Sequence, residues 1–263
     1  MSTSTVTDAE SREPRAESFL WEGHDAGALA IRCGVERLEL FDVTDSTLDA
    51  AHALAEAGAT SGTVVLADAQ RAGRGRMGRA WSSEPGRGVW CTVVERSLDL
   101  PALDVLSIRV GLEVAERLDT SAGETVGIKW PNDLMLGTTK LGGILVETRW
   151  SGTSLAWAAV GVGVNVSTPV GLARAARLPK GARRPDVLVA VVAGVRAAAV
   201  RTGHLTAEEL SRFRARDALR GRRIVEPHEG TVSGIEANGA LVVETRRGAK
   251  RVRTGTIRMA EGL

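Results

Sequence analysis

The feature that most constrains the fold is a change in hydrophobic pattern near Gly221. Before this residue, short strand-like apolar segments alternate with helical patterns. After it, only short strand-like segments remain, separated by the turn pairs Asn238-Gly239 and Arg247-Gly248. Such pairs between apolar runs favour tight hairpins. The pattern predicts a large part that mixes helices and strands, followed by a small all-β barrel.

This change of pattern also predicts the domain boundaries. Residues 1–17 are polar and unpatterned, which is typical of a disordered tail. We expect the main domain over residues 18–216 and the small β domain over residues 217–263.

Within the main domain, periodicity predicts the individual elements. Strands are expected at 35–43, 63–67, 88–94, 126–129, 140–147 and 155–166, and helices at 49–58, 103–118 and 187–195, with another from Thr206. Ser46 with Asp49, and Thr206 with Glu209, have the spacing of capping boxes. His52 is expected to be a partly exposed helix residue and not a ligand.

The composition constrains the possible functions more than it constrains the fold. The chain has 263 residues and a formal net charge of only +2, so its overall charge does not indicate a nucleic-acid-binding protein. Cys33 and Cys91 are far apart with no C-x-x-C spacing, which favours free thiols. No apolar run is long enough to cross a membrane, and no signal peptide pattern is present. We therefore expect a cytoplasmic protein that does not bind a membrane.

The most informative stretch for function is residues 70–81, Gln-Arg-Ala-Gly-Arg-Gly-Arg-Met-Gly-Arg-Ala-Trp. Arginine carries a permanent charge and a fork of donors that fits phosphate and carboxylate oxygens. Closely spaced glycines let the backbone approach a ligand and move. The stretch predicts a mobile cationic loop that closes over a polyanionic small molecule.

Three further groups of residues suit the same kind of ligand. Ser46 and Thr47 follow a predicted strand and begin a helix, where free amides and hydroxyls favour anions or polar groups. Lys129 ends a strand before a Pro-Asn turn that leads to Asp133, and Lys140 opens the next strand. Cations for phosphate oxygens and a carboxylate for Mg²⁺ or a lysine would suit phosphate chemistry. Neither a P-loop, a dinucleotide-binding glycine motif, a kinase signature set nor a G-x-S-x-G motif occurs.

In order and spacing, three blocks resemble those of biotin protein ligases, which activate biotin with ATP and attach it to a lysine of a carrier domain. The blocks are residues 73–81 (Gly-Arg-Gly-Arg-Met-Gly-Arg-Ala-Trp), 129–134 (Lys-Trp-Pro-Asn-Asp-Leu) and 140–147 (Lys-Leu-Gly-Gly-Ile-Leu-Val-Glu). The resemblance extends over residues 35–263. It implies an α+β fold with a mixed or antiparallel central sheet, helices on one face, and a small C-terminal SH3-like β-barrel.

The resemblance also implies roles for individual residues. Those expected to bind biotin are Ser46, Thr47, Gln70, Arg74, Gly75, Arg76, Lys140 and Gly143. Those expected to bind the nucleotide are Arg76, Arg79, Trp81, Asn132 and Asn165. Those expected to act in catalysis are Arg74, Lys129, Asp133 and Lys140, with Asp133 as the ligand of Mg²⁺ or the partner of a lysine. Leu48 stands where many members have asparagine, so that polar contact to biotin is not carried over.

The partners implied are ATP, biotin, Mg²⁺ and the biotin carboxyl carrier protein of a biotin-dependent carboxylase such as acetyl-CoA carboxylase. About 35 residues precede the predicted catalytic block, too few for the DNA-binding domain of some members, so no DNA binding is expected. A monomer or weak dimer is expected.

Three alternatives remain open on the sequence. A lipoate or octanoyl ligase or transferase of the same superfamily would share the fold. The cationic loop of residues 70–81 (the Gly/Arg loop), which includes Gln70, nevertheless favours biotin. A nucleic-acid-binding protein that uses Gly-Arg repeats would normally spread basic charge over a whole face. An inactive relative would keep the fold, but the presence of Arg74, Asp133 and Lys140 favours activity.

Overall fold

The computed structural model describes residues 19–167 and 175–260, so the tail predicted at residues 1–17 lies outside the described residues. The larger part contains a seven-stranded sheet with the order β1-β2-β3-β7-β6-β5-β4. Its strands are β1 (Leu38–Thr44), β2 (Val64–Gln70), β3 (Gly88–Glu95), β4 (Gly127–Lys129), β5 (Asp133–Leu136), β6 (Thr139–Ser151) and β7 (Ser154–Asn165). Only β1 and β2 pair in parallel, while the other neighbours are antiparallel. The prediction of a mixed sheet is confirmed.

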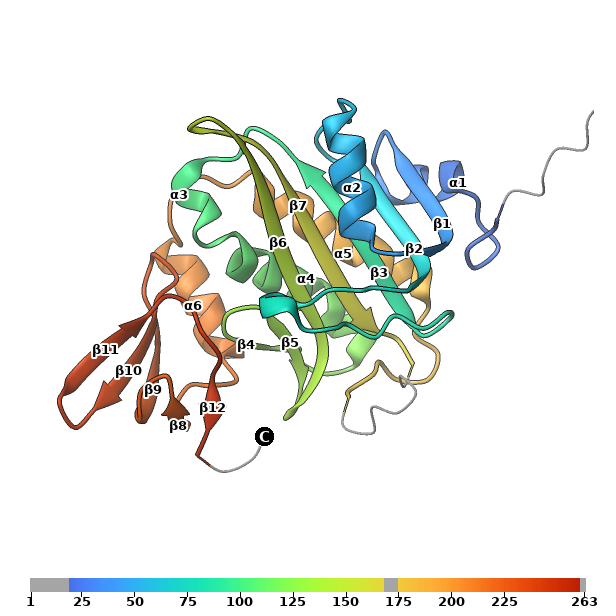
Figure 1. Cartoon of the computed structure of the whole chain (residues 1–263). Coiled ribbons are helices and arrows are strands. Elements are labelled where there is room, and N and C mark those ends of the chain that lie inside the picture. Colours follow the sequence, from blue (N-terminus) through green and yellow to red (C-terminus); the bar gives the residue numbers. More distant parts are fainter. Residues whose placement is uncertain (1–18, 168–174, 261–263) are drawn as a thin grey trace, which may run out of the picture.

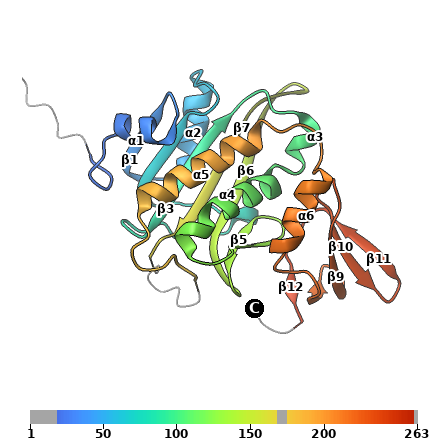
Figure 2. The ribbon, with the colours of Figure 1, turned by 180° about the vertical axis from the view of Figure 1, so that it is seen from behind.

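Helices cover both faces of this sheet, although unequally (Figures 1 and 2). They are α1 (Ala26–Cys33), α2 (Thr47–Glu56), α3 (Leu100–Leu103), α4 (Leu106–Ala122), α5 (Arg184–Ala199) and α6 (Ala207–Arg216). The two long helices α4 and α5 lie together behind the sheet in Figure 1 and in front of it in Figure 2. Helix α2 lies on the opposite face. The expected layer of helices on one face is present as α4 and α5, and α2 is an addition to it.

The alternation of side chains along the strands explains this arrangement. In β2, Val64 and Leu66 belong to the large core on the α4–α5 side, whereas Val65 belongs to a smaller core that includes Leu48 of α2. Successive side chains of a strand point to opposite faces, so a continuous apolar run requires cover on both. Every residue of β3 is buried, as its central position demands.

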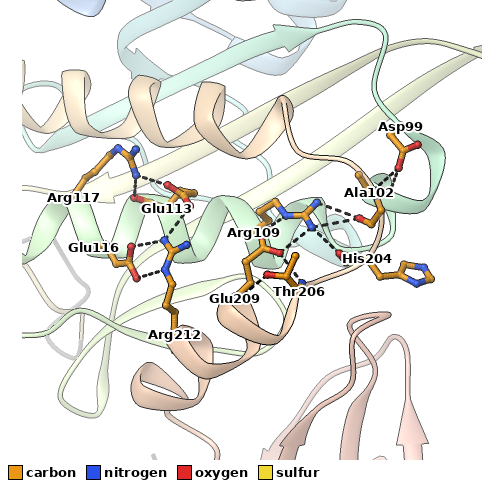
Figure 3. Close-up of polar contacts among 11 residues, drawn as sticks. Asp99, Ala102, Arg109, Glu113, Glu116, Arg117, His204, Thr206, Glu209 and Arg212 are labelled. Carbon is orange, nitrogen blue, oxygen red and sulfur yellow. Dashed lines mark hydrogen bonds and ion pairs between the residues drawn. The ribbon is translucent and has the colours of Figure 1, made fainter.

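Ion pairs join α4 to α6 on the large-core side, as Figure 3 shows. The Nε atom of Arg109 lies 2.6 Å from Oε1 of Glu209, and these side chains are only 1% and 4% exposed. Arg109 also donates to the carbonyls of Gly203 and His204. The predicted capping box of Thr206 and Glu209 is confirmed, so one carboxylate both caps α6 and neutralises the buried arginine.

The C-terminal part is a five-stranded sheet with the order β11-β10-β9-β8-β12, antiparallel throughout. Its strands are β8 (Arg223–Glu226), β9 (Gly230–Ile235), β10 (Leu241–Thr245), β11 (Gly248–Val252) and β12 (Arg258–Met259). The Nε1 atom of Trp130, in the turn before β5, donates to the carbonyl of Gly239 at 2.8 Å. This bond fastens the β9–β10 turn to the larger sheet. The change from α6 to β8 supports the proposed domain division after Arg216.

Helices α1 and α3 and strands β5 and β12 were not predicted from the sequence. All are short, and none shows a clear apolar period. No helix in the described part of the chain is long and apolar enough to span a bilayer.

Candidate functional site

A cavity of about 340 Å³ lies on the α2 face of the seven-stranded sheet. All three sequence blocks line it, and the end of β2 contributes Gln70. The predicted site residues in its wall are Thr47, Gln70, Arg74, Gly75, Arg76, Arg79, Trp81, Lys129, Asn132, Asp133, Lys140, Gly143 and Asn165. Residues nearly 120 positions apart in the sequence therefore form one site.

Ser46 is the one predicted site residue that the structure does not place in the cavity wall. It is 1% exposed, and its Oγ accepts from the backbone amide of Leu48 at 3.3 Å. Ser46 thus caps α2, as its position before the helix predicts. Asp49 does not complete a capping box, because its carboxylate accepts from Arg74 instead.

The floor of the cavity is made of glycines from two paired strands. Gly161 and Gly163 of β7 alternate with valines that point into the core on the other face, and Gly143 of β6 pairs with Gly163. The indole of Trp81 lies against this floor, so that a Cβ added at Gly163 would come within 2.7 Å of the ring. Contacts this short do not occur between real carbon atoms, so the floor requires glycine. Trp81, which the resemblance predicts to bind the nucleotide, is thereby held against the floor of the cavity.

One end of the cavity is a polar network at the start of α2. Oε1 of Gln70 accepts from the backbone amide of Thr47 at 2.8 Å and from its hydroxyl at 3.1 Å. Thr92 donates to the Thr47 hydroxyl oxygen, and the Gln70 amide donates to Ser83. The side chains of Thr47 and Gln70 are therefore fixed in position, with neutral donors and acceptors and no charge. Such an end suits a neutral polar group of a ligand.

The opposite side of the cavity carries cations. Nζ of Lys140 lies 2.7 Å from Oδ1 of Asp133 and 5.0 Å from the centroid of the Trp81 ring. The register explains the ion pair, since β5 begins at Asp133 and runs beside the start of β6. Lys129 ends β4 directly across from Asp133. Of the two roles expected for Asp133, the structure shows that of a lysine partner.

Arg76 and Arg74 occupy different electrostatic environments, although they are two residues apart. Burial lowers the pKa of Arg76, and the nearby carboxylate of Asp133 only partly opposes this effect. Its guanidinium has Oδ1 of Asn132 at 3.4 Å as a neutral neighbour. An arginine that has lost solvent without gaining a close carboxylate is stabilised by an incoming anion.

Arg74, in contrast, is held by two carboxylates. Its Nη1 donates to Asp49 Oδ2 at 2.8 Å, and its Nη2 lies 3.4 Å from Oε2 of Glu147. The hydrogen bond to Asp49 raises the pKa of Arg74, and Glu147 adds to the increase. The same hydrogen bond lowers the pKa of Asp49. Glu147 lies in the third sequence block, but no pattern in the sequence indicated a role for it.

The prediction that His52 is partly exposed is wrong. It is 7% exposed, and it contacts Glu147 and Trp157. A helical position alone did not show that β6 and β7 pass over this side of α2.

The C-terminal part supplies a wall of the cavity that the sequence did not predict. Gly255, Thr256 and Ile257 line it, and Arg79 donates to the Thr256 hydroxyl at 2.9 Å. This contact joins positions 177 residues apart, so no local pattern could have found it. Among the described residues, no cluster of three or more His, Cys, Asp or Glu side chains forms a metal site.

Known proteins resemble the chain both in sequence, over about half of its length, and in fold. Residues 40–165 match the Biotin/lipoate A/B protein ligase family. The bifunctional ligase/repressor BirA of Bacillus subtilis (strain 168) is 38% identical over 133 residues, which are 50% of this chain and 41% of that protein. The biotin–[acetyl-CoA-carboxylase] ligase of Paracoccus denitrificans is 39% identical over 127 residues, 47% of this chain and 52% of that protein. The biotin protein ligase of Aquifex aeolicus, solved in complex with biotin and ATP, superposes with a TM-score of 0.70 at 24% identity, over 86% of this chain and 100% of that one.

The class of protein follows from these matches. Residues 40–165 belong to the biotin/lipoate A/B protein ligase family, and the described chain has the fold of a biotin protein ligase. The chain spans about two fifths of the Bacillus relative and about half of the Paracoccus relative.

Proposed function

We propose that the chain adenylates biotin with ATP to form biotinyl-5'-AMP, and then transfers biotin to a lysine of a biotin carboxyl carrier protein. One observation carries this proposal. The three blocks converge on a single cavity that has a neutral polar end at Thr47 and Gln70 and a cationic side at Arg76, Lys129 and Lys140. Biotin has a neutral ureido ring at one end and a carboxylate at the other, which matches this polarity.

The polar end would recognise the ureido ring. This ring offers one carbonyl acceptor and two N–H donors, and leaving such a group unpaired in a buried site costs about 1–3 kcal/mol. Gln70 and Thr47 are already held by hydrogen bonds to one another and to Ser83 and Thr92. Their fixed positions reduce the entropy lost on binding. Leu48, 4% exposed at the base of this end, offers apolar contact only.

The cationic side would allow two anions to react. The biotin carboxylate oxygen attacks the α-phosphorus of ATP, the bond to the β-phosphate oxygen breaks, and pyrophosphate leaves. At an effective dielectric constant near 20, one cation at about 4 Å offsets roughly 4 kcal/mol of the repulsion between two such charges. Lys140 and Arg76 border the space where both anions would lie, with Lys129 as a further cation. Trp81, Asn132, Asn165 and Arg79 remain the proposed nucleotide-binding residues.

The product is a mixed anhydride, which water hydrolyses. The Gly/Arg loop and the 255–257 segment both border the cavity, so together they would limit the access of water to it. The amine of the carrier lysine then attacks the biotinyl carbonyl, AMP leaves, and the amine loses a proton as the amide forms.

Magnesium would enter with ATP, on the phosphate oxygens. Asp133 is the one carboxylate in the cavity wall among the described residues, so it is our candidate to contact the ion. A single carboxylate beside substrate phosphates is a usual arrangement for Mg²⁺, which retains several waters. The chemistry that the ion supplies is neutralisation of phosphate charge.

The decisive test combines the purified chain, biotin, MgATP and a biotin carrier domain. We expect covalent labelling of the carrier lysine, detected by mass spectrometry, and no labelling when ATP is omitted. An unlabelled carrier, together with no biotin-dependent exchange of pyrophosphate into ATP, would refute the proposal.

A lipoate-type activity is the alternative within the same family. The apolar dithiolane ring of lipoate could form no hydrogen bond with this polar end, whereas the ureido ring of biotin has two donors and an acceptor, which favours biotin. Competition of biotin against lipoate in the pyrophosphate exchange reaction distinguishes the two. A nucleic-acid function is not favoured, because the arginines of the loop converge on a cavity and on carboxylates instead of covering a face.

A further inference from the structure

We propose that His52 and Glu147 form a positioning pair that holds Arg74, and through it the Gly/Arg loop, over the cavity. Neither residue lines the cavity wall, so both would act through the arginine. The effect on adenylate retention rests on the proposed function, whereas the effect on loop position does not.

The first step is the orientation of His52. The Nε1 atom of Trp157 lies 2.9 Å from His52 Nδ1, and an indole N–H can only donate. Nδ1 of His52 therefore accepts, and the ring proton is on Nε2. Nε2 lies 3.0 Å from Oε2 of Glu147 and so donates to it. Trp157 thus fixes the tautomer that lets His52 donate to the carboxylate.

The second step is the contact of Glu147 with Arg74. The same oxygen that accepts from His52, Oε2, lies 3.4 Å from Nη2 of Arg74. The Glu147 side chain is 26% exposed and the His52 side chain 9%, so these bonds are partly shielded from water. With Asp49 on the other guanidinium nitrogen, Arg74 is held from two elements, α2 and β6.

The third step is the link from Arg74 to the rest of the loop. Arg74 forms an isolated antiparallel bridge with Ala80, and the Trp81 amide donates to the Gly73 carbonyl at 2.8 Å. A shift of Arg74 would therefore carry with it the segment that ends in Trp81. Because the glycines of the loop give the backbone little resistance to movement, side-chain anchors decide where it lies. Arg74 is such an anchor, and His52 orients the carboxylate that holds it.

Limited trypsin digestion of the ligand-free protein tests the inference without any catalytic step. Cleavage after Arg76 and Arg79, followed by mass spectrometry, reports how often the loop leaves its place. We expect Glu147→Ala and His52→Ala to raise this rate by about three- to tenfold, the range for loss of a partly exposed ion pair or hydrogen bond. His52→Gln keeps one donor and one acceptor, so it should restore most of the protection. Glu39→Gln on β1, which alters the ion pair of Glu39 with Arg37, is the matched control and should leave the rate unchanged.

A double-variant series separates positioning from simple packing. Once Arg74→Ala has removed the anchored side chain, adding Glu147→Ala or His52→Ala should not increase cleavage further. A fully additive effect would overturn the inference, as would cleavage within twofold of the parent chain in Glu147→Ala. Should His52→Ala lower the melting temperature strongly, Glu147→Ala and Trp157→Phe, which removes the indole N–H together with part of the ring, still decide the question.

The catalytic consequence is measured separately. Glu147→Ala should release biotinyl-AMP about three- to tenfold faster in a filter-retention assay, with a smaller change in the KM for ATP. If the parent chain formed no adenylate, the proposed function would fail while the digestion results would still decide on loop position. If adenylate formed and its release were unchanged in a variant whose loop had opened, the link between loop position and retention would be wrong.

Discussion

The two faces of the seven-stranded sheet use charge in opposite ways. Behind the sheet, four arginines of α4 and α6 meet four carboxylates, and every one is paired. They are Arg109, Arg117, Arg212 and Arg216 with Glu113, Glu116, Asp119 and Glu209. In the wall of the cavity in front, five cations accompany a single carboxylate, Asp133. The cations are Arg74, Arg76, Arg79, Lys129 and Lys140.

The difference shows which charges stabilise the fold and which are available to a ligand. Matched charges behind the sheet satisfy one another, as buried charges must. In front, Asp49 and Glu147 neutralise Arg74 from outside the wall, but the other four cations share Asp133 alone, and this excess leaves a positive potential that an added anion can neutralise. Changes behind the sheet should therefore alter stability, and changes in front should alter ligand chemistry.

The largest loss of stability is expected for Arg109→Ala, behind the sheet. It would leave the buried carboxylate of Glu209 without its cation, and breaking a buried pair costs about 3–5 kcal/mol in the free energy of unfolding. Urea denaturation measures this change. Arg117→Ala is the control on the same helix, because its partly exposed pair should contribute about 1 kcal/mol or less. Equal losses in the two variants would contradict the importance given to burial.

Lys140→Ala, in front of the sheet, should lower the activity and leave the stability almost unchanged. Loss of a cation that faces the developing charge should lower the rate of biotin-dependent pyrophosphate exchange by about 10²–10³-fold or more. The free energy of unfolding should change by about 1 kcal/mol or less, since the Lys140 side chain is 40% exposed. Lys250→Ala on β11 is the control and should keep full activity. A loss of stability as large as that in Arg109→Ala would erase the contrast between the two faces.

A smaller effect is expected for Gly163→Ala in the floor of the cavity. The added Cβ would lie 2.7 Å from Trp81, so the indole must move, at about 1–3 kcal/mol for such overpacking. We expect the KM for ATP to rise more than the KM for biotin. Gly27→Ala in helix α1, where the nearest atom is 3.5 Å away, should leave both constants unchanged. Unchanged kinetics in Gly163→Ala would show that the indole position is not needed for the nucleotide.

The smallest expected effect is a loss of stability that appears only at acid pH and comes from the carboxylates behind the sheet. Burial works to raise the pKa of Glu113, but hydrogen bonds from Arg117 and Arg212 outweigh it and hold the pKa below the usual 4.5. A depressed pKa stabilises the fold at pH values above the unfolded pKa, and this stabilisation is lost as the pH falls through the lower folded value. The melting temperature should therefore decline below about pH 4.5, and less steeply in Arg212→Gln, whose Glu113 has lost one partner. Identical declines in both proteins would refute this assignment.

Much of the site could be predicted from the sequence because its residues occur in short blocks with a local reason to be where they are. Strand ends place Lys129 and Lys140, and a Pro-Asn turn brings Asp133 back beside them. The sequence could not show the pairing of Arg74 with Asp49, since a carboxylate at that position serves equally as a helix cap or as an ion-pair partner. The tertiary position of the loop decides between the two.

By itself, the sequence of this protein determined most of the strands, the caps at Ser46 and Thr206, the cationic loop and the three blocks, because each depends on neighbours within a few residues. Only the tertiary structure decided that His52 is buried against Glu147 and Trp157, that Glu147 contacts Arg74, and that residues 255–257 line the cavity. These contacts join residues far apart in the chain. Their existence depends on how complete elements pack, which no local pattern specifies.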